Sequence, residues 1–436
     1  MRVLDSSQIT ESSARELFRQ GLENFAEVVS TVQSIVDDVK TRGDAALLEY
    51  TSKFDGVELT AGTLIVSPEE IDDAYTQVPA SFVEALQHAK RNIAAFHEAQ
   101  LRPEWQVETE PGVKVGQIWR PIESVGLYAP GGRAAYPSSV LMAAVPAKVA
   151  GVKTLVLATP PSRDGTVNPA ILVAARESGV DIIVKAGGAQ GIAALAYGTE
   201  TVPRVQKIVG PGNKYVMAAK QLVSIVVAID MPAGPSEILV IVDDQADPDL
   251  AVLDLFSQVE HDPDNLGILI VPSQEAANAY EQKIQEMLPD APRNDIVEAA
   301  LDAQGTIIIC QSREEVVRVT NLIGPEHLEI LTANPREIMN QVNNAGAIFL
   351  GTFSPVPIGD FSAGSNHILP TGGYSKQYSG VSAFDFVKLM DFVECNAEGL
   401  ANCGPAAIEI AKFEGFGGHA ATITTRLEKM NKTEDA

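Results

Sequence analysis

The chain has 436 residues, more than one hydrophobic core usually fills, so two or more domains are expected. It carries 57 acidic and 32 basic residues, and the formal net charge of −25 argues against nucleic acid or an anionic membrane surface as the main partner. Hydrophobic residues make up 45% of the chain, as in an ordinary folded protein, and its three cysteines form no C-x-x-C pair, which favours a reducing cytoplasm over a disulfide framework.

The start of the chain and its most apolar stretch argue against export and membrane insertion. The first 18 residues, MRVLDSSQITESSARELF, carry acids early and lack the apolar core of a signal peptide. The most apolar stretch, residues 138–161, is interrupted by Pro146, Lys148 and Lys153, so it lacks the roughly 18 uninterrupted apolar residues of a membrane helix. We therefore expect a cytoplasmic protein with no membrane partner.

Residues 1–115 are expected to form a mostly helical N-terminal segment. Apolar side chains recur every three or four residues in 28–54 and in 79–100, which is the spacing of an amphipathic helix. His88 and His97 have no metal-ligating partner at helical spacing, so we expect both on the helix surface.

Residues 116–236 alternate short β-rich runs with alanine-rich helical stretches. Strands are expected at 124–132, 153–161, 181–188 and 205–213, with helices at 138–152, 169–179, 189–198 and 214–223. Such alternation predicts a parallel sheet with helices on both faces.

Residues 237–380 continue the alternation as a second α/β domain of similar size, and 381–436 follow as a C-terminal segment. In the second domain, strands are expected at 237–244, 265–273, 305–311 and 347–353, with helices at 249–261, 276–288 and 313–323. No direct sequence repeat relates the two domains, so duplication stays an open alternative. The C-terminal stretches 381–404 and 406–430 predict helices.

Four of the six histidines lie in turn-rich stretches of the C-terminal half, each near an acid, an amide or a glycine. They are His261, His327, His367 and His419. Gln258 and His261 are three residues apart, which places both on one helical face and suits two ligands of one metal. A polar pair at a helix end has the same spacing and is the competing interpretation.

Two glycine-rich stretches supply further candidate ligands. Asp360 and His367 lie in GDFSAGSNH, a loop expected after a strand, and Glu414 and His419 flank the glycines of EGFGGH. A set of Gln, His, Asp and His donors would suit Zn²⁺ or a similar divalent ion. Spacing alone leaves open whether these residues converge.

Glu326 and His327 are adjacent in NLIGPEHLEI and are candidates for proton transfer. Neighbouring residues of a regular strand face opposite sides, but a strand that ends at Gly324-Pro325 can bend so that both side chains reach one pocket. The carboxylate could then take a proton from water and the imidazole one from a substrate hydroxyl. An exposed turn is the alternative interpretation.

Two glycine-containing turns are candidates for nucleotide binding. GGAQG and GPGNKY each lie between an expected strand and helix, but both lack the third glycine of the G-x-G-x-x-G pattern. A nucleotide could still bind at these helix N-termini, with Tyr128, Gln190 and Asn213 available to hold ribose or adenine.

Several ordered blocks of the sequence resemble the histidinol dehydrogenase family. They are VKTRGDAALLEYTSKFDGV, IVGPGNKYVMAAK, IDMPAGPSEILVI, FSQVEHDPDN, GPEHLEI, GDFSAGSNHILPTGG and EGFGGH, and they span nearly the whole chain. The resemblance implies NAD-dependent, zinc-dependent oxidation of L-histidinol to L-histidine through L-histidinaldehyde, the last steps of histidine biosynthesis. It also implies a homodimer and two intertwined, incomplete Rossmann-like α/β domains of the aldehyde dehydrogenase-like kind.

The resemblance assigns these regions and residues to roles. Residues 116–236 would bind NAD, 237–380 would carry the metal and catalytic residues, and 381–436 would be a helical tail contributing to the site of the other subunit. One zinc per subunit would be held by Gln258, His261 and Asp360 with His419 of the other subunit. Glu326 and His327 would be catalytic. The substrate contacts implied are Ser236, Gln258, His261, His327, Asp360, His367, Glu414 and His419, and the NAD contacts are Tyr128, Gln190 and Asn213.

The chain departs from the family pattern at a few positions. Val356 stands where many members carry Glu, and Phe361 stands where many carry Tyr, both near the expected substrate site. Val242 and Ala251 also differ, in elements expected to be buried. Val356 motivates the alternative of a family paralogue that oxidises another small polar alcohol, such as a sulfonated diol. A zinc hydrolase using Glu326 and His327, or a non-catalytic scaffold, would belong to other classes.

Overall fold

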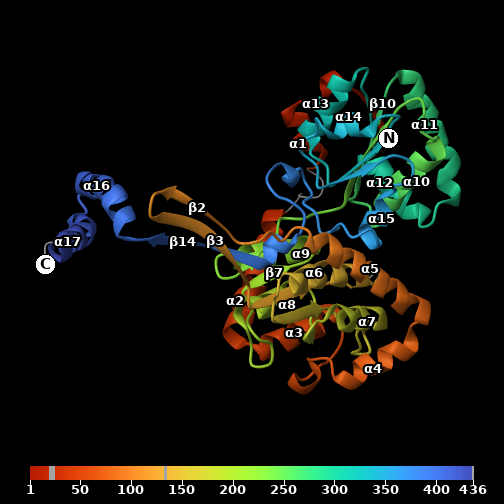
Figure 1. The fold of residues 1–436 in the computed structure, drawn as a ribbon. Helices are drawn as coiled ribbons and strands as arrows, with labels where there is room; N and C mark the ends of the chain where they lie inside the picture. The colour runs from red at the N-terminus through yellow and green to blue at the C-terminus, as the bar shows by residue number, and fades with distance from the viewer. Residues whose placement is uncertain (19–24, 132–134, 435–436) are drawn as a thin grey trace. The chain divides into compact units, whose positions relative to one another are not determined.

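The computed structural model describes residues 1–18, 25–131 and 135–434, so the last residue of the strand expected at 124–132 lies outside the described residues (Figure 1). The chain forms two compact units. The first contains Met1–Gln100 and Ile122–Phe386, and the second contains Leu101–Pro121 and Val387–Ala436. The second unit is therefore assembled from two stretches that are far apart in sequence, and the first of them, Leu101–Pro121, interrupts the first unit.

The first sheet of the first unit contains five parallel strands in the order β6-β5-β4-β7-β8. The strands are β4 (Ser124–Tyr128), β5 (Thr154–Thr159), β6 (Ile182–Lys185), β7 (Lys207–Val209) and β8 (Ala228–Ile229). The alternating helices are α6 (Pro137–Val149), α7 (Pro169–Ser178), α8 (Gly188–Tyr197) and α9 (Lys214–Val223). The predicted parallel α/β arrangement of this region is confirmed, because parallel neighbours need such crossover helices.

The N-terminal helices pack onto this sheet and its helices. They are α2 (Phe25–Arg42), α3 (Asp44–Asp55), α4 (Pro68–Gln77) and α5 (Ala80–Glu98). The apolar face of α2 joins the core of the first sheet beside α8 and α9, while α4 and α5 contact α6 and α7. His97 was expected on a helix surface, but it is fully buried in α5. The segment is helical, although it also contains strands.

The second sheet contains six parallel strands in the order β1-β11-β10-β9-β12-β13. They are β1 (Arg2–Asp5), β9 (Glu237–Val242), β10 (Leu266–Val271), β11 (Thr306–Ile309), β12 (His327–Leu331) and β13 (Ala347–Leu350). The sequence prediction missed β1, which brings the chain start to the edge of this sheet and so intertwines the two α/β parts. It also placed no strand at β12.

Helices cover both faces of the second sheet. They are α1 (Glu11–Leu17), α10 (Pro248–Val259), α11 (Gln274–Met287), α12 (Asn294–Gln304), α13 (Arg313–Ile323), α14 (Pro335–Met339) and α15 (Val356–Phe361). One core joins Ile238 and Val240 of β9 to α10 and α12, and a second joins Leu239 and Ile241 to α1 and α13. Val242 and Ala251 are buried in the first of these cores, as predicted.

The two parallel sheets share one strand order. With β4 and β9 as the first strands and β1 left aside, each sheet runs third, second, first, fourth, fifth along the chain. The chain adds its first three strands toward one edge of the sheet and the next two toward the other edge. The order therefore reverses between the first and fourth strands, which are β4 and β7 in one sheet and β9 and β12 in the other. Ligands of open α/β sheets bind beside this reversal, outside the carboxyl ends of the strands.

The second unit is a three-stranded antiparallel sheet followed by two helices. Its strands are β2 (Trp105–Glu110), β3 (Val113–Pro121) and β14 (Val387–Cys395), in the order β14-β3-β2, and its helices are α16 (Ala397–Phe413) and α17 (Gly417–Glu434). The expected helix at 381–404 is therefore wrong over β14, where nine residues pair with β3. The expected helix at 406–430 is interrupted at Gly415, whose φ is 80°.

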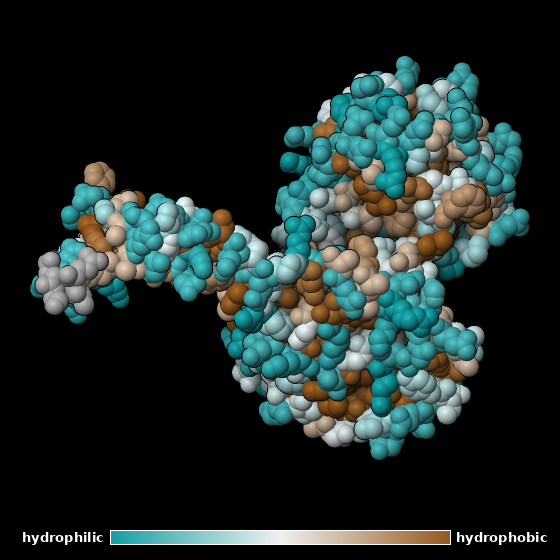
Figure 2. Space-filling view, viewed as in Figure 1, coloured by the Kyte–Doolittle hydropathy of each residue, from teal (hydrophilic) through white to brown (hydrophobic). Residues whose placement is uncertain are grey.

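Apolar side chains lie exposed on the second unit (Figure 2). They are Trp105, Val107, Leu389, Met390, Val393, Ile410, Phe413 and Phe416. Exposed apolar groups of this extent mark an interaction surface rather than a solvated one. Among the described residues, no helix has the length and apolarity needed to cross a membrane.

Candidate functional site

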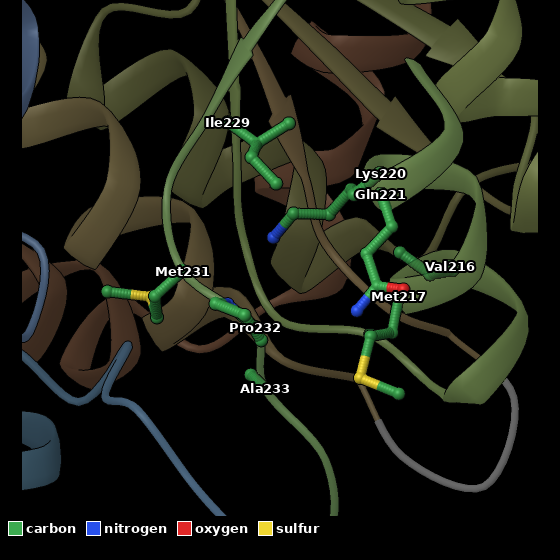
Figure 3. A pocket seen from close by; sticks show the side chains of 9 residues that line it. Val216, Met217, Lys220, Gln221, Ile229, Met231, Pro232 and Ala233 are labelled. Atoms are coloured by element: carbon green, nitrogen blue, oxygen red, sulfur yellow. The ribbon is translucent and has the colours of Figure 1, made fainter. Parts of the chain in front are cut away.

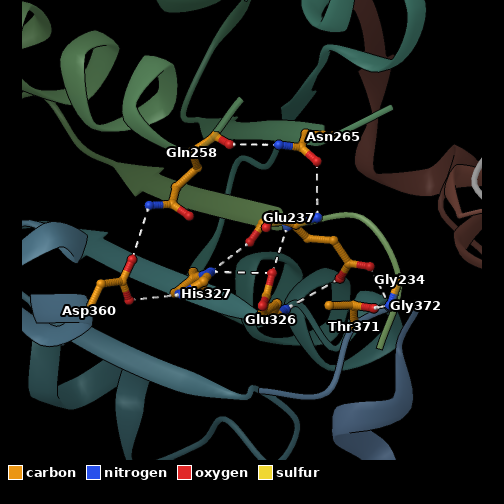
Figure 4. Close-up of polar contacts among 10 residues, drawn as sticks. Gly234, Glu237, Gln258, Asn265, Glu326, His327, Asp360, Thr371 and Gly372 are labelled. Carbon is orange, nitrogen blue, oxygen red and sulfur yellow. Dashed lines mark hydrogen bonds and ion pairs between the residues drawn. The ribbon is translucent and has the colours of Figure 1, made fainter. Parts of the chain in front are cut away.

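Glu326 and His327 lie side by side at the start of β12 (Figure 4). Nδ1 of His327 lies 3.5 Å from Oε2 of Glu326 and donates a 3.1 Å hydrogen bond to the carbonyl oxygen of Glu237. The two residues are only 5% and 3% exposed, respectively. The interpretation as an exposed turn is therefore wrong, and the pair is held inside the first unit.

The backbone before β12 explains how two adjacent side chains meet. α13 ends at Ile323 and is capped by Gly324, which has a φ of 65°, and Pro325 then leads into a strand that begins at His327. The Gly-Pro step therefore precedes the strand and does not end one, contrary to expectation. Glu326 lies just outside the strand and is free of its alternation. A Cβ at Gly346 would come 2.5 Å from the Glu326 carbonyl oxygen, so this approach requires glycine.

Asp360 connects the pair to Gln258. Its Oδ1 lies 3.3 Å from Nε2 of His327, and its Oδ2 lies 3.5 Å from Nε2 of Gln258. Gln258 is in the last turn of α10, where its carbonyl oxygen accepts a 2.9 Å hydrogen bond from the Asn265 side chain. Asp360 is part of the short helix α15, and not of a loop as expected. The site therefore combines the end of a helix with the start of a strand.

His261 lies beyond the end of α10, because that helix stops at Val259. Gln258 and His261 consequently do not share a helical face, and the helical-spacing argument for them is wrong. The turn after the helix nevertheless keeps both residues close in sequence at the same end of α10. In parallel α/β folds this helix end lies beside the amino ends of the strands, where His327 also begins β12.

Gln258, His261 and Asp360 offer an amide oxygen, an imidazole and a carboxylate. The amide oxygen of Gln258 accepts no hydrogen bond from any described residue. Burial raises the pKa of Asp360, but the neighbouring imidazole of His327 outweighs it, so the pKa lies below its usual value and the carboxylate stays ionised. These donors fit a zinc ion. In the part of the chain that the structure describes, no three His, Cys, Asp or Glu side chains converge as a metal-binding group.

The charges of the buried groups determine where protons are held. Burial lowers the pKa of His327, but the carboxylates of Glu326 and Asp360 outweigh it and raise the pKa well above its usual value. Burial, together with the charge of Glu326, raises the pKa of Glu237 well above its usual value. The cluster therefore favours a proton on His327 and another on Glu237, each beside an acid.

His367 and Ser236 belong to the same unit and flank this cluster. Nδ1 of His367 donates a 2.9 Å hydrogen bond to the carbonyl oxygen of Asp360, and its Nε2 lies 3.2 Å from the Ser139 hydroxyl on α6. Burial lowers the pKa of His367, so its imidazole is neutral at neutral pH. The N–H of Ser236 donates a 3.0 Å hydrogen bond to Asn265, which also holds the end of α10.

Glu414 and His419 belong to the second unit, where both are exposed. Glu414 caps the C-terminal end of α16, and His419 lies in the first turn of α17 with its ring 5.3 Å from that of Phe416. The first unit by itself therefore does not contain the whole predicted set of ligands.

The predicted NAD contacts lie at the carboxyl ends of the first sheet. Tyr128 ends β4, and its hydroxyl accepts a 3.1 Å hydrogen bond from the N–H of Gly188, the first residue of α8. Burial raises the pKa of Tyr128 to about 12, which keeps this hydroxyl protonated. Gln190 is buried in the first turn of α8, and Asn213 is exposed and caps α9 by accepting bonds from two backbone N–H groups.

The turn that follows β7 is braced by a buried ion pair which the sequence analysis missed. Gly210 has a φ of 136°, and a Cβ there would come 2.2 Å from the carbonyl oxygen of Tyr128. Its N–H donates a 2.8 Å hydrogen bond to Asp230, its carbonyl oxygen accepts one of 2.9 Å from Lys220, and these two side chains pair with each other. The reversal point between β4 and β7 is therefore rigid.

A small pocket lies beside this ion pair (Figure 3). Its walls are Gly212, Val216, Met217, Lys220, Gln221, Ile229, Met231, Pro232 and Ala233. Most of these side chains are apolar, and Figure 3 shows them on α9, at Ile229 in β8 and along residues 231–233 that follow this strand.

Glu237 is a further member of this buried cluster that the sequence analysis did not identify. It is an acid that opens the otherwise apolar strand EILVIV, and it is buried beside both members of the Glu326-His327 pair. A charged residue is rarely buried without a partner, so an acid at the head of an apolar strand was the available signal.

Comparison with known proteins covers almost the whole chain. The sequence model of histidinol dehydrogenase matches residues 19–427. A histidinol dehydrogenase of Methanosarcina barkeri is 44% identical over 422 residues, covering 97% of this chain and 96% of that protein. One of Clostridium acetobutylicum is 48% identical over 410 residues, covering 94% of each. The crystal structure of histidinol dehydrogenase from Elizabethkingia anophelis matches with a TM-score of 0.89 and 39% identity, covering 94% of this chain and 97% of that one.

Proposed function

This chain belongs to the histidinol dehydrogenase family, and we propose that it oxidises L-histidinol to L-histidine through L-histidinaldehyde with two NAD⁺. The main support for this proposal is the buried Glu326-His327 pair, which is linked through Asp360 to Gln258. An alcohol-to-acid oxidation needs one group to take the hydroxyl proton and another to activate water, and this cluster offers both. The reaction would complete histidine biosynthesis in the cytoplasm.

His327 accepts the proton of the substrate hydroxyl as the first hydride leaves. Its Nδ1–H is bound to the Glu237 carbonyl oxygen, which directs the other nitrogen, Nε2, toward Asp360. The carboxylates that raise the pKa of His327 make its imidazole a stronger base, so it takes the hydroxyl proton in the molecules whose Nε2 is unprotonated. The same imidazole is needed in both oxidation steps.

Glu326 activates the water that attacks the aldehyde. Its Oε2 accepts a 2.8 Å hydrogen bond from the N–H of Glu237, whereas its Oε1 accepts none from the described residues and is available to a water. A fixed carboxylate of this kind serves as a general base at the second step only. Hydride transfer from the hydrated aldehyde then gives the carboxylate product.

We expect one zinc per subunit, held by Gln258, His261 and Asp360 and by His419 of a second copy. Bound zinc would hold the imidazole and amine of the substrate and direct its alcohol carbon toward the nicotinamide. Ser236, His367 and Glu414 would contact the substrate. Removal of the metal by a chelator should abolish NADH formation, and added Zn²⁺ should restore it.

A homodimer with shared sites accounts for the residues on the second unit. Glu414 and His419 are exposed there, among side chains such as Val393 and Phe413 that are exposed and apolar. Contact with a second copy would bury this surface and would bring the two polar groups to a site on that copy.

NAD is expected at the reversal point of the first sheet. Tyr128, Gln190 and Asn213 lie at the end of β4 and at the starts of α8 and α9, and helix N-termini of this kind favour a bound phosphate. The absence of the third glycine of the G-x-G-x-x-G pattern agrees with an incomplete Rossmann-like fold.

The family paralogue acting on another small polar alcohol is the second candidate. Val356 is fully buried in the core beside α10 and supplies no carboxylate there, while Phe361, next to Asp360 in sequence, is exposed. NADH formation with L-histidinol should be compared with that from a sulfonated diol. A preference for the diol would favour the paralogue.

The stoichiometry of NADH is the decisive test of the proposed function. Close to two NADH per L-histidinol are expected, with L-histidine as the product. One NADH per substrate with accumulating aldehyde would refute the four-electron scheme. No NADH with any alcohol would favour the zinc hydrolase, and inactivity in every assay would favour a scaffold.

A further inference from the structure

Glu237 lies beside Glu326 at the amino ends of two paired strands (Figure 4). β9 and β12 are parallel neighbours with His327 opposite Ile238, so Glu326 lies opposite Glu237 one step earlier. The N–H of Glu237 donates a 2.8 Å hydrogen bond to Oε2 of Glu326, and the N–H of Glu326 donates one of 3.4 Å to Oε2 of Glu237. Each acid therefore accepts a hydrogen bond from the backbone of the other.

The other carboxyl oxygen of Glu237 reaches a different part of the chain. Its Oε1 accepts a hydrogen bond from the N–H of Gly372, and the neighbouring Thr371 hydroxyl accepts one from the N–H of Gly234. One side chain thus links the start of β12 to the turn around Gly372, and the same turn is linked to the stretch that carries Ser236. The Glu237 carbonyl oxygen also fixes the orientation of His327.

Burial of two neighbouring carboxyl groups costs free energy, so a purely structural role would not favour an acid at position 237. Glu237 and Glu326 are both buried, and two adjacent carboxyl groups in a dry site repel each other whenever both ionise. An amide or an apolar residue at position 237 would avoid that repulsion. A carboxyl at this costly position therefore points to a role in holding the base, Glu326.

We propose that Glu237 is a positioning residue for Glu326, holding it so that Oε1 faces the attacking water. This inference rests on the proposed function, in which Glu326 acts only in aldehyde oxidation. The side chain of Glu237 bonds to the backbone of Glu326, whereas His327 is bound by the Glu237 backbone, which a side-chain substitution leaves in place. Loss of the side chain should consequently impair the second oxidation more than the first.

The test compares E237A and E237Q with wild type and with the core variant I241A. Ile241 lies on the same strand and faces the same side of the sheet, but contacts none of these groups. Initial rates of NADH formation are measured separately from L-histidinol and from L-histidinaldehyde, together with Tm. In E237A the aldehyde-to-alcohol rate ratio should fall at least about tenfold, with aldehyde released.

E237Q should lower the ratio only about threefold, because the amide keeps one of the two acceptor oxygens. I241A should lower Tm without changing the ratio, which separates positioning from general destabilisation. An E237A ratio within about twofold of wild type would overturn the proposal. If E237A does not fold, an unchanged ratio in E237Q overturns it instead.

Amide hydrogen exchange tests the same contacts without any substrate. At least one of the N–H groups of Glu326 and Gly372 should exchange faster in E237Q than in wild type, whereas those along β10 should not change. Unchanged exchange at both amides would also overturn the proposal. If wild-type protein forms no NADH from L-histidinol, the proposed function fails, and amide exchange still decides whether Glu237 positions Glu326.

Discussion

Glu329 should make the protein less stable as the pH rises, and Glu329→Gln should remove this effect. Glu329 lies in the middle of β12 with 0% exposure, and neither carboxyl oxygen has a well-aligned hydrogen-bond partner among the described residues. Burial, with the charge of Asp254 on α10, raises the pKa of Glu329 from 4.5 to about 9. The folded protein therefore holds this proton more tightly than the unfolded chain.

The difference between the folded and unfolded pKa of Glu329 determines how the free energy of unfolding changes with pH. A carboxyl whose folded pKa is raised has no cost below pH 4.5, and its contribution becomes more unfavourable as the pH rises toward about 9. Each pH unit within this window costs about 1.4 kcal/mol of unfolding free energy, or about 3 kcal/mol between pH 6 and pH 8. Gln cannot ionise, so E329Q should gain this amount relative to wild type over the same interval.

The assay is urea unfolding of wild type and E329Q at pH 6 and pH 8. Glu298→Gln, at an exposed position on α12, is the matched control and should follow wild type at both values. Asp254→Asn removes the facing charge and should reduce the wild-type pH slope. If the change in unfolding free energy between pH 6 and pH 8 in E329Q stayed within about 0.5 kcal/mol of that in wild type, the result would refute a protonated Glu329 in the folded protein.

Three further predictions concern the site and its supports. Glu326→Gln should slow aldehyde oxidation by about 100-fold and alcohol oxidation much less, whereas His327→Asn should slow both, when the two rates are measured separately. Full histidine production by the Glu326→Gln variant would contradict the proposed role of Glu326. Chains with His419→Ala and chains with His261→Ala should each be inactive but partly active when mixed, and no recovery after proven mixing would contradict a shared site. Asp230→Asn leaves Lys220 buried without its carboxylate and should lower the free energy of unfolding by about 3–5 kcal/mol, seen as a lower Tm. An unchanged Tm would contradict a stabilising role of this ion pair.

Local sequence patterns were sufficient for most of the first unit. Apolar runs bounded by glycine and proline predicted eight of the eleven strands of the two parallel sheets, because parallel strands are buried on both faces. They failed at β1, β8 and β12, and they also gave no strand at β2, β3 or β14 of the second unit. β14 pairs with β3 from the other end of the chain, and such long-range hydrogen bonding outweighs a local pattern that fits a helix equally well.

The sequence by itself determined the residue types of the site, its acid-imidazole pair, and the parallel α/β class. Only the tertiary structure decided that Glu326 and His327 are buried, that Asp360 and Gln258 lie beside them, and that Glu237 faces the pair from a neighbouring strand. The physical reason is that these contacts join residues about 30 to 100 positions apart, whose proximity depends on strand register and helix packing, not on local spacing.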